Sequence, residues 1–324
     1  MNSLCDYVKR NLEKMGFQTL DVRKIREGIF EIRTDKEKLI LKTSRSIRNS
    51  HNNFIKKFLL KKTFKHEVRI TRDLSSLSHH TEFNTPDLVL TDDASYMVID
   101  YIEGTPVDYK QDYHIDRIVL SMLSFQFTRL RIQTNTFSKV IPSLLNNKFI
   151  GINQRLLSRR LKELTLKQKM KLVFIFVSAS LKNKKVRVPF NLHNDLRVNT
   201  LLDKDSVLNI IDFESLVSEK KWVLTDILYC AFDSNSFSFN GKLFREYLIK
   251  LYENYGIAIN GKALKTQTRM ILCYIIIRLL SSSQRDAYKR MELVEFLKIL
   301  LSKKEFNQWY SKNIDSTMHV NKGI

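Results

Sequence analysis

The chain has 324 residues, of which 43% are hydrophobic and 27% are charged, and it contains only 8 Gly and 4 Pro. This composition excludes a wholly disordered chain and a collagen-like repeat, and the length suffices for one large or two modest domains with a hydrophobic core. The cysteines, Cys5, Cys230 and Cys273, lie far apart and exclude a disulfide framework or a Cys-x-x-Cys zinc site, so we expect a reducing, cytoplasmic setting.

The 55 basic residues outnumber the 34 acidic residues, and the formal net charge of +21 is concentrated in the middle of the chain. Residues 105–188 hold 17 basic and 4 acidic residues, a net +13, whereas 1–104 and 189–324 each hold 19 basic and 15 acidic residues. A basic field of this size attracts phosphate groups on nucleic acid, anionic lipid or a phosphorylated substrate. The alternative explanation is an AT-rich genome, whose codons favour Lys, Asn and Ile.

Short apolar–polar alternations dominate the chain up to residue 104 and predict strands, whereas helical spacing of apolar residues dominates after it. We predict strands at 28–33, 38–42, 87–90 and 96–100 and a helix within 50–77. After 104 we predict helices at 115–131, 153–183, 241–255, 262–282, 286–303 and 305–311, and a strand–loop–strand hairpin from 192–202 and 207–213. The longest apolar stretches, 172–181 and 271–277, are far shorter than the ~20 residues of a membrane-spanning helix, and segment 1–10 is unlike a signal peptide, so we expect a soluble protein.

Two carboxylates, Asp195 and Asp212, stand at the ends of the predicted hairpin. Phosphoryl transfer needs such a pair, because one carboxylate accepts the proton of the attacking hydroxyl while the other holds the magnesium that bridges the nucleotide phosphates. Any hairpin can carry an Asp at each end, so the spacing alone leaves a purely structural role open.

Upstream, Lys42 ends a buried strand, where its charge is costly unless it is paired or meets a phosphate. Glu67, on the predicted helix that follows, is the candidate partner. Each residue alone is weak evidence, because strand-end lysines and helical glutamates are common. The order of the motifs along the chain carries more information.

That order is a strand Lys42, a helical Glu67, the segment Tyr-Met-Val-Ile-Asp-Tyr-Ile-Glu-Gly at 96–104, His193-x-Asp195 and Ile-Asp-Phe-Glu at 211–214. It resembles a protein-kinase-like fold, and its details resemble the aminoglycoside phosphotransferase and choline kinase branch, over residues 20–230. The resemblance implies an α+β, bilobal fold. A small N-terminal antiparallel sheet plus helix, with the hinge (1–104), would bind nucleotide, and a larger, mostly α lobe (105–324) would carry catalysis and substrate binding.

The resemblance also implies ATP and Mg²⁺ as cofactors and assigns residues to the nucleotide. Lys42 would contact the α- and β-phosphates, and Glu67 would orient it. At the hinge, backbone groups of Asp100 and Ile102 would bind adenine, and Ile99 would line the pocket behind them.

In the catalytic part, the resemblance implies that Asp195 is the catalytic base and Asp212 the chief magnesium ligand. His193 would brace the loop, and Asp226 would act as an N-cap or a loop brace.

The sequence departs from the family pattern at two places. The family has a magnesium-binding Asn five residues after the catalytic Asp, whereas this chain has Thr200 there and Asn199 one place earlier, so either would complete the metal site. The loop that covers the nucleotide contains only Gly28, which reduces the backbone N–H groups that can cradle phosphate.

The basic middle segment bears on the acceptor. A polycationic aminoglycoside or a choline headgroup would be bound by acidic or aromatic walls, whereas a basic surface suits an anionic molecule. We therefore predict transfer to a hydroxyl of a small molecule, a sugar or an anionic surface glycolipid or lipopolysaccharide component, with peripheral contact to the anionic inner face of the membrane. A solvated basic helix face without a ligand is the alternative.

Other functions stay open. A catalytically impaired pseudokinase scaffold is supported by Thr200, and a choline- or aminoglycoside-type kinase has the same motifs. Protein-kinase activity is less favoured, because no Ala-Pro-Glu anchor follows Asp212. Nucleic acid is not favoured as a partner, because the sequence has no helix-turn-helix, zinc or RNA-motif signature.

Overall fold

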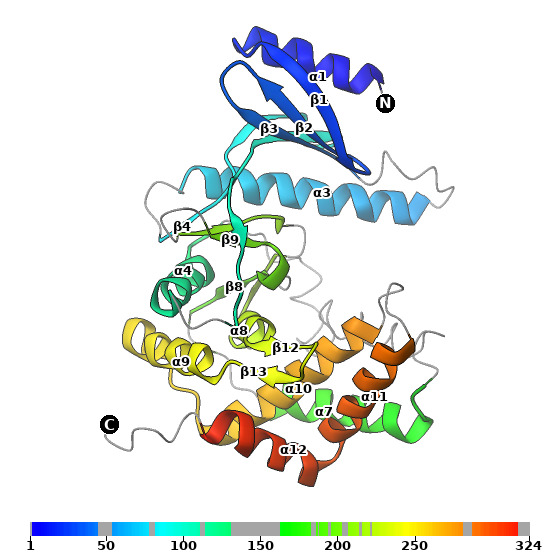
Figure 1. Ribbon diagram of the computed structural model, residues 1–324, viewed down its shortest axis with the longest axis vertical. Coiled ribbons are helices and arrows are strands. Elements are labelled where there is room, and N and C mark those ends of the chain that lie inside the picture. Colours follow the sequence, from blue (N-terminus) through cyan, green and yellow to red (C-terminus); the bar gives the residue numbers. More distant parts are fainter. Residues whose placement is uncertain are drawn as a thin grey trace. The chain divides into compact units, whose positions relative to one another are not determined.

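The computed structural model (Figure 1) divides into two compact units. The first comprises Met1–Pro106, Arg129–Arg131 and Asn199–Leu216, and the second comprises Val107–Thr128, Ile132–Val198 and Val217–Ile324. The structure describes residues 2–44, 54–77, 82–110, 114–130, 163–182, 186, 188–193, 196–202, 207–213, 216–220, 222–280 and 287–316. The division into lobes at residues 104 and 105 stays a prediction.

An antiparallel sheet in the order β1-β2-β3-β6-β5 forms the centre of the first unit. The strands expected around residues 28, 38, 87 and 96 are confirmed to within one residue at each end. The edge strand β1 and the helix α1 were not predicted as elements. The bounds are α1 Asn2–Lys14, β1 Thr19–Arg26, β2 Ile29–Thr34, β3 Lys38–Thr43, α3 Phe54–Ser75, β5 Leu88–Thr91 and β6 Tyr96–Asp100.

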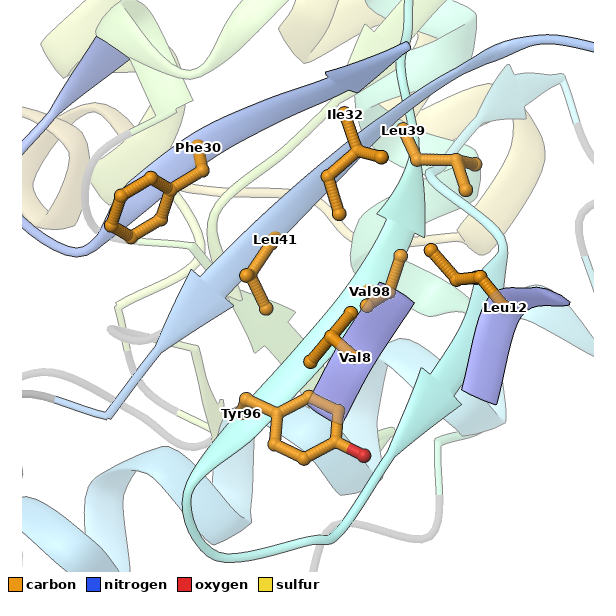
Figure 2. Packing of buried hydrophobic residues seen from close by; sticks show 8 residues of the cluster. All are labelled: Val8, Leu12, Phe30, Ile32, Leu39, Leu41, Tyr96 and Val98. Carbon is orange, nitrogen blue, oxygen red and sulfur yellow. The ribbon is translucent and has the colours of Figure 1, made fainter. Parts of the chain in front are cut away.

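The two faces of this sheet are covered by different helices, because alternate residues of a strand point to opposite sides. One face packs against Val8 and Leu12 of α1, as Figure 2 shows; its sheet residues are Phe30, Ile32, Leu39, Leu41, Tyr96 and Val98. On the other face, Met97 of β6 packs against Phe64 and Val68 of α3. The face toward α1 is a continuous apolar core.

A second, mixed sheet in the order β4-β10-β9-β7 completes the first unit, and here the predicted hairpin is only partly correct. Strands β9 and β10 pair as expected, but the residues just before Asp195 form β8, which pairs with β11 in the second unit. One continuous strand from 192 to 202 is therefore wrong. The bounds are β4 Phe83–Asn84, β7 Thr105–Pro106, β8 Phe190–Leu192, β9 Thr200–Leu202, β10 Leu208–Ile210 and β11 Val217–Glu219.

Gly104 lies against β9 at very short range. A Cβ atom at this position would lie 2.8 Å from the carbonyl oxygen of Leu202 and 2.9 Å from Cβ of Leu201. Backbone atoms cannot move aside as a flexible side chain can, so only glycine fits where the chain leaves β6 and enters β7.

The second unit is mostly helical, and its helix α10 packs against α7, α8 and α11. The helices expected from residue 241 onward are confirmed to within two residues at each end. Of the described helices, none is long and apolar enough to cross a membrane. The bounds are α4 Ile115–Phe127, α7 Leu166–Lys182, α8 Thr225–Ala231, β12 Phe232–Asp233, β13 Ser238–Phe239, α9 Gly241–Tyr255, α10 Gly261–Leu280, α11 Ala287–Leu301 and α12 Lys303–Tyr310.

Two helices differ from the prediction. Helix α4 ends four residues earlier than expected, because Thr128 adopts an extended conformation and its N–H bonds back to Phe125. Helix α7 begins after Thr165, which forms a capping box: its N–H donates to the Gln168 side chain and its hydroxyl accepts from the Gln168 N–H. The earlier part of the predicted helix, residues 153–162, lies outside the described residues.

Candidate active site

Lys42 is the centre of a buried charge cluster in the first unit. It pairs with Met97 in the β3–β6 register, and its side chain therefore lies on the face of the sheet that α3 covers. Its ammonium donates to Oε1 of Glu67 and, at 2.7 Å, to Oδ1 of Asp212. Burial favours the neutral amine, but the two carboxylates outweigh it and raise the pKa of Lys42 above its ordinary value. Lys42 is therefore a fixed cation at neutral pH.

Glu67 reaches Lys42 because it shares the inward face of α3 with Phe64, Val68 and Thr71, at helical spacing. A carboxylate buried this deeply is destabilising unless an opposite charge meets it. The predicted ion pair between Glu67 and Lys42 is confirmed.

Asp212 follows β10 and has a left-handed backbone, with φ of 63°. This conformation costs roughly 1–2 kcal/mol for most residues, and Asp tolerates it better than most. Neighbouring contacts hold the turn: the Ile211 N–H donates to the Asn199 carbonyl at 3.0 Å, and Phe213 is buried. The strained turn therefore fixes a carboxylate beside Lys42, as is common at functional sites.

Asn199 and Thr200 both lie across the β9–β10 pairing from the residues that lead into Asp212. Thr200 pairs with Ile210, and both are fully buried, so the Thr200 side chain belongs to the core side of the strand. Asn199, one residue earlier, is only half-buried. Asp212 and Asn199 provide the hard oxygen donors that Mg²⁺ prefers, and one carboxylate is enough where substrate phosphates complete the shell. These residues therefore fit a magnesium ion.

The residues of the predicted hinge lie at the end of β6. The Asp100 N–H donates to the Asp87 carbonyl at 3.1 Å, and the Tyr101 N–H donates to the Lys38 carbonyl at 3.0 Å. Among the described residues, nothing accepts a hydrogen bond from the Ile102 N–H. Ile99 pairs with Ile40 in the sheet and packs beside Met97, on the same face as Lys42.

The Asp100 side chain has an unusual environment. Burial raises its pKa to about 6, the neighbouring carboxylates of Asp87 and Glu37 contribute in the same direction, and a hydrogen bond from the Asp87 N–H opposes them. Asp100 thus acts as a structural link between β6 and the segment before β5, in addition to its place in the hinge.

Gly28 lies in the turn between β1 and β2, where φ is +69°. Its carbonyl accepts hydrogen bonds from the N–H and the hydroxyl of Thr43 at the end of β3. Gly28 therefore ties the turn to the strand that carries Lys42.

In the second unit, His193 is fully buried, and its backbone N–H donates to the Asp226 carboxylate at 2.8 Å. Asp226 lies in the first turn of α8, where Leu224 is the capping residue, so the brace interpretation is confirmed and the N-cap interpretation is wrong. Asp195, the predicted base, lies outside the described residues.

A charge cluster in the second unit was not predicted. Lys110 and Arg197 both approach the buried carboxylate of Asp233, at 2.7 and 3.5 Å, and Arg197 also bonds the Phe232 carbonyl. Burial works against ionisation of Asp233, but the bonds from Lys110 and Ser236 dominate and hold its pKa well below the ordinary range. No local pattern signals this cluster, because its members are far apart in the sequence.

A second unpredicted contact links α3 to the segment after Asp212. The Nε2 atom of His66 lies 3.0 Å from the Leu216 carbonyl, and burial lowers the pKa of His66, which favours the neutral ring. The contact adjoins Glu67 and helps to fix α3 against the segment that follows Asp212.

The two-faced sheet with its Lys42–Glu67 pair, followed by a helical unit, is the architecture of a protein-kinase-like fold.

No protein-family model and no curated protein matches the sequence. Solved structures do match. The gentamicin complex of APH(2")-IIa has a TM-score of 0.59 and 16% identity, covering 94% of this chain and 97% of that chain.

Two further structures belong to different enzymes. The choline kinase LicA from Streptococcus pneumoniae has a TM-score of 0.58 and 13% identity, covering 92% of this chain and 99% of its own. The macrolide 2'-phosphotransferase MphH from Brachybacterium faecium has a TM-score of 0.56 and 11% identity, covering 90% of this chain and 98% of its own. The predicted fold class is thus confirmed: the chain has the protein-kinase-like fold that these phosphotransferases share.

Proposed function

We propose that this protein is an ATP-dependent phosphotransferase that moves the γ-phosphate to a hydroxyl group of a small molecule. The observation that carries the proposal is the buried ammonium of Lys42, held between Glu67 and Asp212. Here one cation is shared by a buried carboxylate and by a strained, partly exposed one, so that it can bind the phosphates of a nucleotide beside a metal ligand.

Residues of the first unit would bind the nucleotide. Lys42 would contact the α- and β-phosphates, while Glu67 holds its side chain extended. The Ile102 N–H and the Asp100 carbonyl would bond the adenine edge, and Ile99 would contact its ring. Of these residues, Ile99 lies on the sheet face that carries Lys42, and Asp100 and Ile102 follow it along the chain.

Asp212 would be the chief ligand of Mg²⁺, and we favour Asn199 over Thr200 as the second, because Thr200 faces the core. Bound magnesium neutralises charge that develops on the transferring phosphate. The left-handed turn at Asp212 holds the carboxylate in place without reorganisation during the reaction.

Asp195 would act as the base. The acceptor oxygen bonds the γ-phosphorus, the bond from that phosphorus to the β–γ bridging oxygen breaks, and the hydroxyl proton passes to the Asp195 carboxylate. The products are the phosphorylated acceptor and ADP. Asp226 would fix the backbone of the loop through the His193 N–H.

For the acceptor we infer a sugar or an anionic glycolipid, used at the inner face of a membrane. The similar structures include enzymes for aminoglycosides, macrolides and choline. In this chain, Arg197 follows Asp195 by two positions. Arg197 and Lys110 share the single carboxylate of Asp233, which leaves a surplus positive charge. A surplus of positive charge suits an anionic acceptor better than a polycation.

The second candidate is a pseudokinase that binds nucleotide without turnover. The buried Thr200 at the position where the family has Asn supports it.

The decisive experiment measures transfer of label from γ-labelled ATP, with magnesium, into fractionated extract of the native host. We expect label in a sugar or glycolipid fraction with the wild-type protein and none with Asp195→Asn. Nucleotide binding by both proteins, followed by thermal shift, controls for folding.

Three outcomes would count against parts of this proposal. Undiminished transfer by Asp195→Asn or Asp212→Ala contradicts the assigned residues. Binding of nucleotide without any transfer by the wild type favours the pseudokinase. Label in a cationic acceptor contradicts the anionic acceptor class but leaves the phosphotransferase.

A further inference from the structure

Helix α7 is apolar on both of its sides. The side toward the second unit is buried, as expected for a core helix, through Leu172, Ile175, Phe176 and Ala179. The opposite side carries Leu166, Met170 and Phe174, with 76%, 63% and 72% of their surface exposed. We call these three residues the α7 stripe. An apolar side of a helix is normally buried, so the α7 stripe needs an explanation.

The spacing of the α7 stripe makes it one continuous surface. Its members are four residues apart, and at 3.6 residues per turn they fall within an arc of about 80°. The arc is centred opposite the buried side. Single exposed apolar residues are common on protein surfaces, but three large ones in one row are not.

Lysines border the α7 stripe on both sides. By helical geometry Lys167 and Lys171 lie along one edge, and Lys169 lies along the other. The helix contains no acidic residue. Lysine stems can lie along apolar surface while the ammonium groups reach outward to anions. Apolar side chains between two basic edges are the pattern of a helix that lies in a membrane interface.

The neighbouring helix α11 also carries exposed apolar side chains. Tyr288 and Met291, in the first turns of α11, are also strongly exposed. Between them in the sequence, Arg290 bonds Glu163, three residues before the start of α7, at 2.6 Å. The two helices pack together in the second unit, where Figure 1 shows α7 in green and α11 in dark orange.

We propose that the α7 stripe, with its lysine borders and the start of α11, docks the protein on the surface of an anionic lipid bilayer. The net +13 of residues 105–188 favours this partner over an uncharged one. A bilayer also accepts an apolar row without the shape complementarity that a protein partner would need. The inference does not require that the protein be a kinase, because docking is measured without ATP.

The test is co-sedimentation of the full chain with vesicles of phosphatidylcholine and phosphatidylglycerol, compared with vesicles of phosphatidylcholine alone. We expect binding to the mixed vesicles only, weakened by added salt. Phe174→Gln should weaken it at least tenfold. Lys167→Ala combined with Lys171→Ala should weaken it by about fivefold for each lysine, equivalent to ~1 kcal/mol each.

Matched controls come from the same unit. Tyr252→Gln removes an exposed aromatic residue of α9, and Lys303→Ala combined with Lys304→Ala removes two exposed lysines of α12. Both should bind like the wild type. Oxidation by peroxide gives an independent readout, because docking should protect the exposed Met170.

Four results would overturn the proposal. The first is that the protein does not bind to mixed vesicles, and the second is that the control and stripe variants weaken vesicle binding equally. The third is that Met170 is oxidised at the same rate with and without vesicles. The fourth is that the protein forms a dimer in the absence of lipid and that Phe174→Gln dissociates it. The last result would assign the α7 stripe to a second copy of the chain.

Discussion

The two faces of the β1-β2-β3-β6-β5 sheet have different roles although they share the same strands. The face toward α1 carries a continuous apolar core, in which residues such as Leu41 and Val98 pack against one another and the helix. The face toward α3 carries Lys42 and Ile99 among apolar neighbours, and Glu67 reaches it from the helix. Successive residues such as Leu41 and Lys42 therefore belong to different parts of the molecule, one to its stability and the other to its site.

This arrangement explains how a buried charge can be held accurately. Burial of the apolar face orders the strand, and the strand then fixes the backbone of Lys42, so that only its side chain remains to be ordered by Glu67 and Asp212. Substitutions on the two faces should therefore separate activity from stability.

The largest effect is expected from Lys42→Met. The loss of a preorganised cation should lower kcat by about 100- to 1000-fold. It should also lower the free energy of unfolding by about 3–5 kcal/mol, because Glu67 stays buried without its partner. Phosphate transfer and urea denaturation measure the two effects.

The double variant Lys42→Met with Glu67→Gln distinguishes these two effects. It should regain most of the stability and none of the activity. Recovery of activity together with stability would contradict a role for Lys42 at the phosphates.

Leu41→Ala tests the opposite face. Leu41 is fully buried against α1 and its neighbours, so the free energy of unfolding should fall by about 2–5 kcal/mol. Well below the melting temperature, kcat/KM should be unchanged. A loss of kcat/KM as large as that of Lys42→Met would show that the two faces are not separable.

The smallest effect is expected from Asp100→Asn, at the end of the same sheet. The folded-state pKa of about 6 exceeds the ordinary 3.8, so the folded protein holds the proton more tightly than the unfolded chain. The contribution of Asp100 to the free energy of unfolding should therefore fall as the pH rises from about 4 to about 6.

Asparagine cannot ionise and can still accept the bond from the Asp87 N–H. The variant should thus be more stable by about 2 kcal/mol at pH 7 and show no such decline. Urea denaturation across this range is the measurement. A difference in stability between the variant and the wild type that stays constant between pH 4 and pH 6 would contradict the burial of this carboxyl.

The sequence allowed us to predict those strands and helices whose apolar residues recur with a regular period. Strands β3 and β6 have one apolar face, and their alternation located them correctly, as the order of motifs located the Lys42–Glu67 pair. Strand β1 was missed because it is a sheet edge, where most side chains are exposed and charged residues interrupt the alternation. Helix α7 could have been placed better, because Thr165 and Gln168 form a recognisable capping box.

Other features depend on contacts between distant segments and leave no local pattern. The residues on either side of Asp195 were taken for one strand, but they pair with different partners in β8 and β9. The position of Asp212 beside Lys42 follows from a left-handed turn that its sequence permits but does not specify. The pairing of Lys110 with Asp233 likewise depends on tertiary structure alone.

The close approach at Gly104 has a consequence for sequence divergence. Because the obstacle is the main chain of β9, no compensating substitution at a neighbouring side chain can make room for even a methyl group. Among homologues that keep this sheet, position 104 should stay glycine while the surrounding residues drift. A homologue with a larger residue there should have lost the pairing of β7 with β9. The residue at position 104 therefore indicates whether a homologue keeps this part of the second sheet.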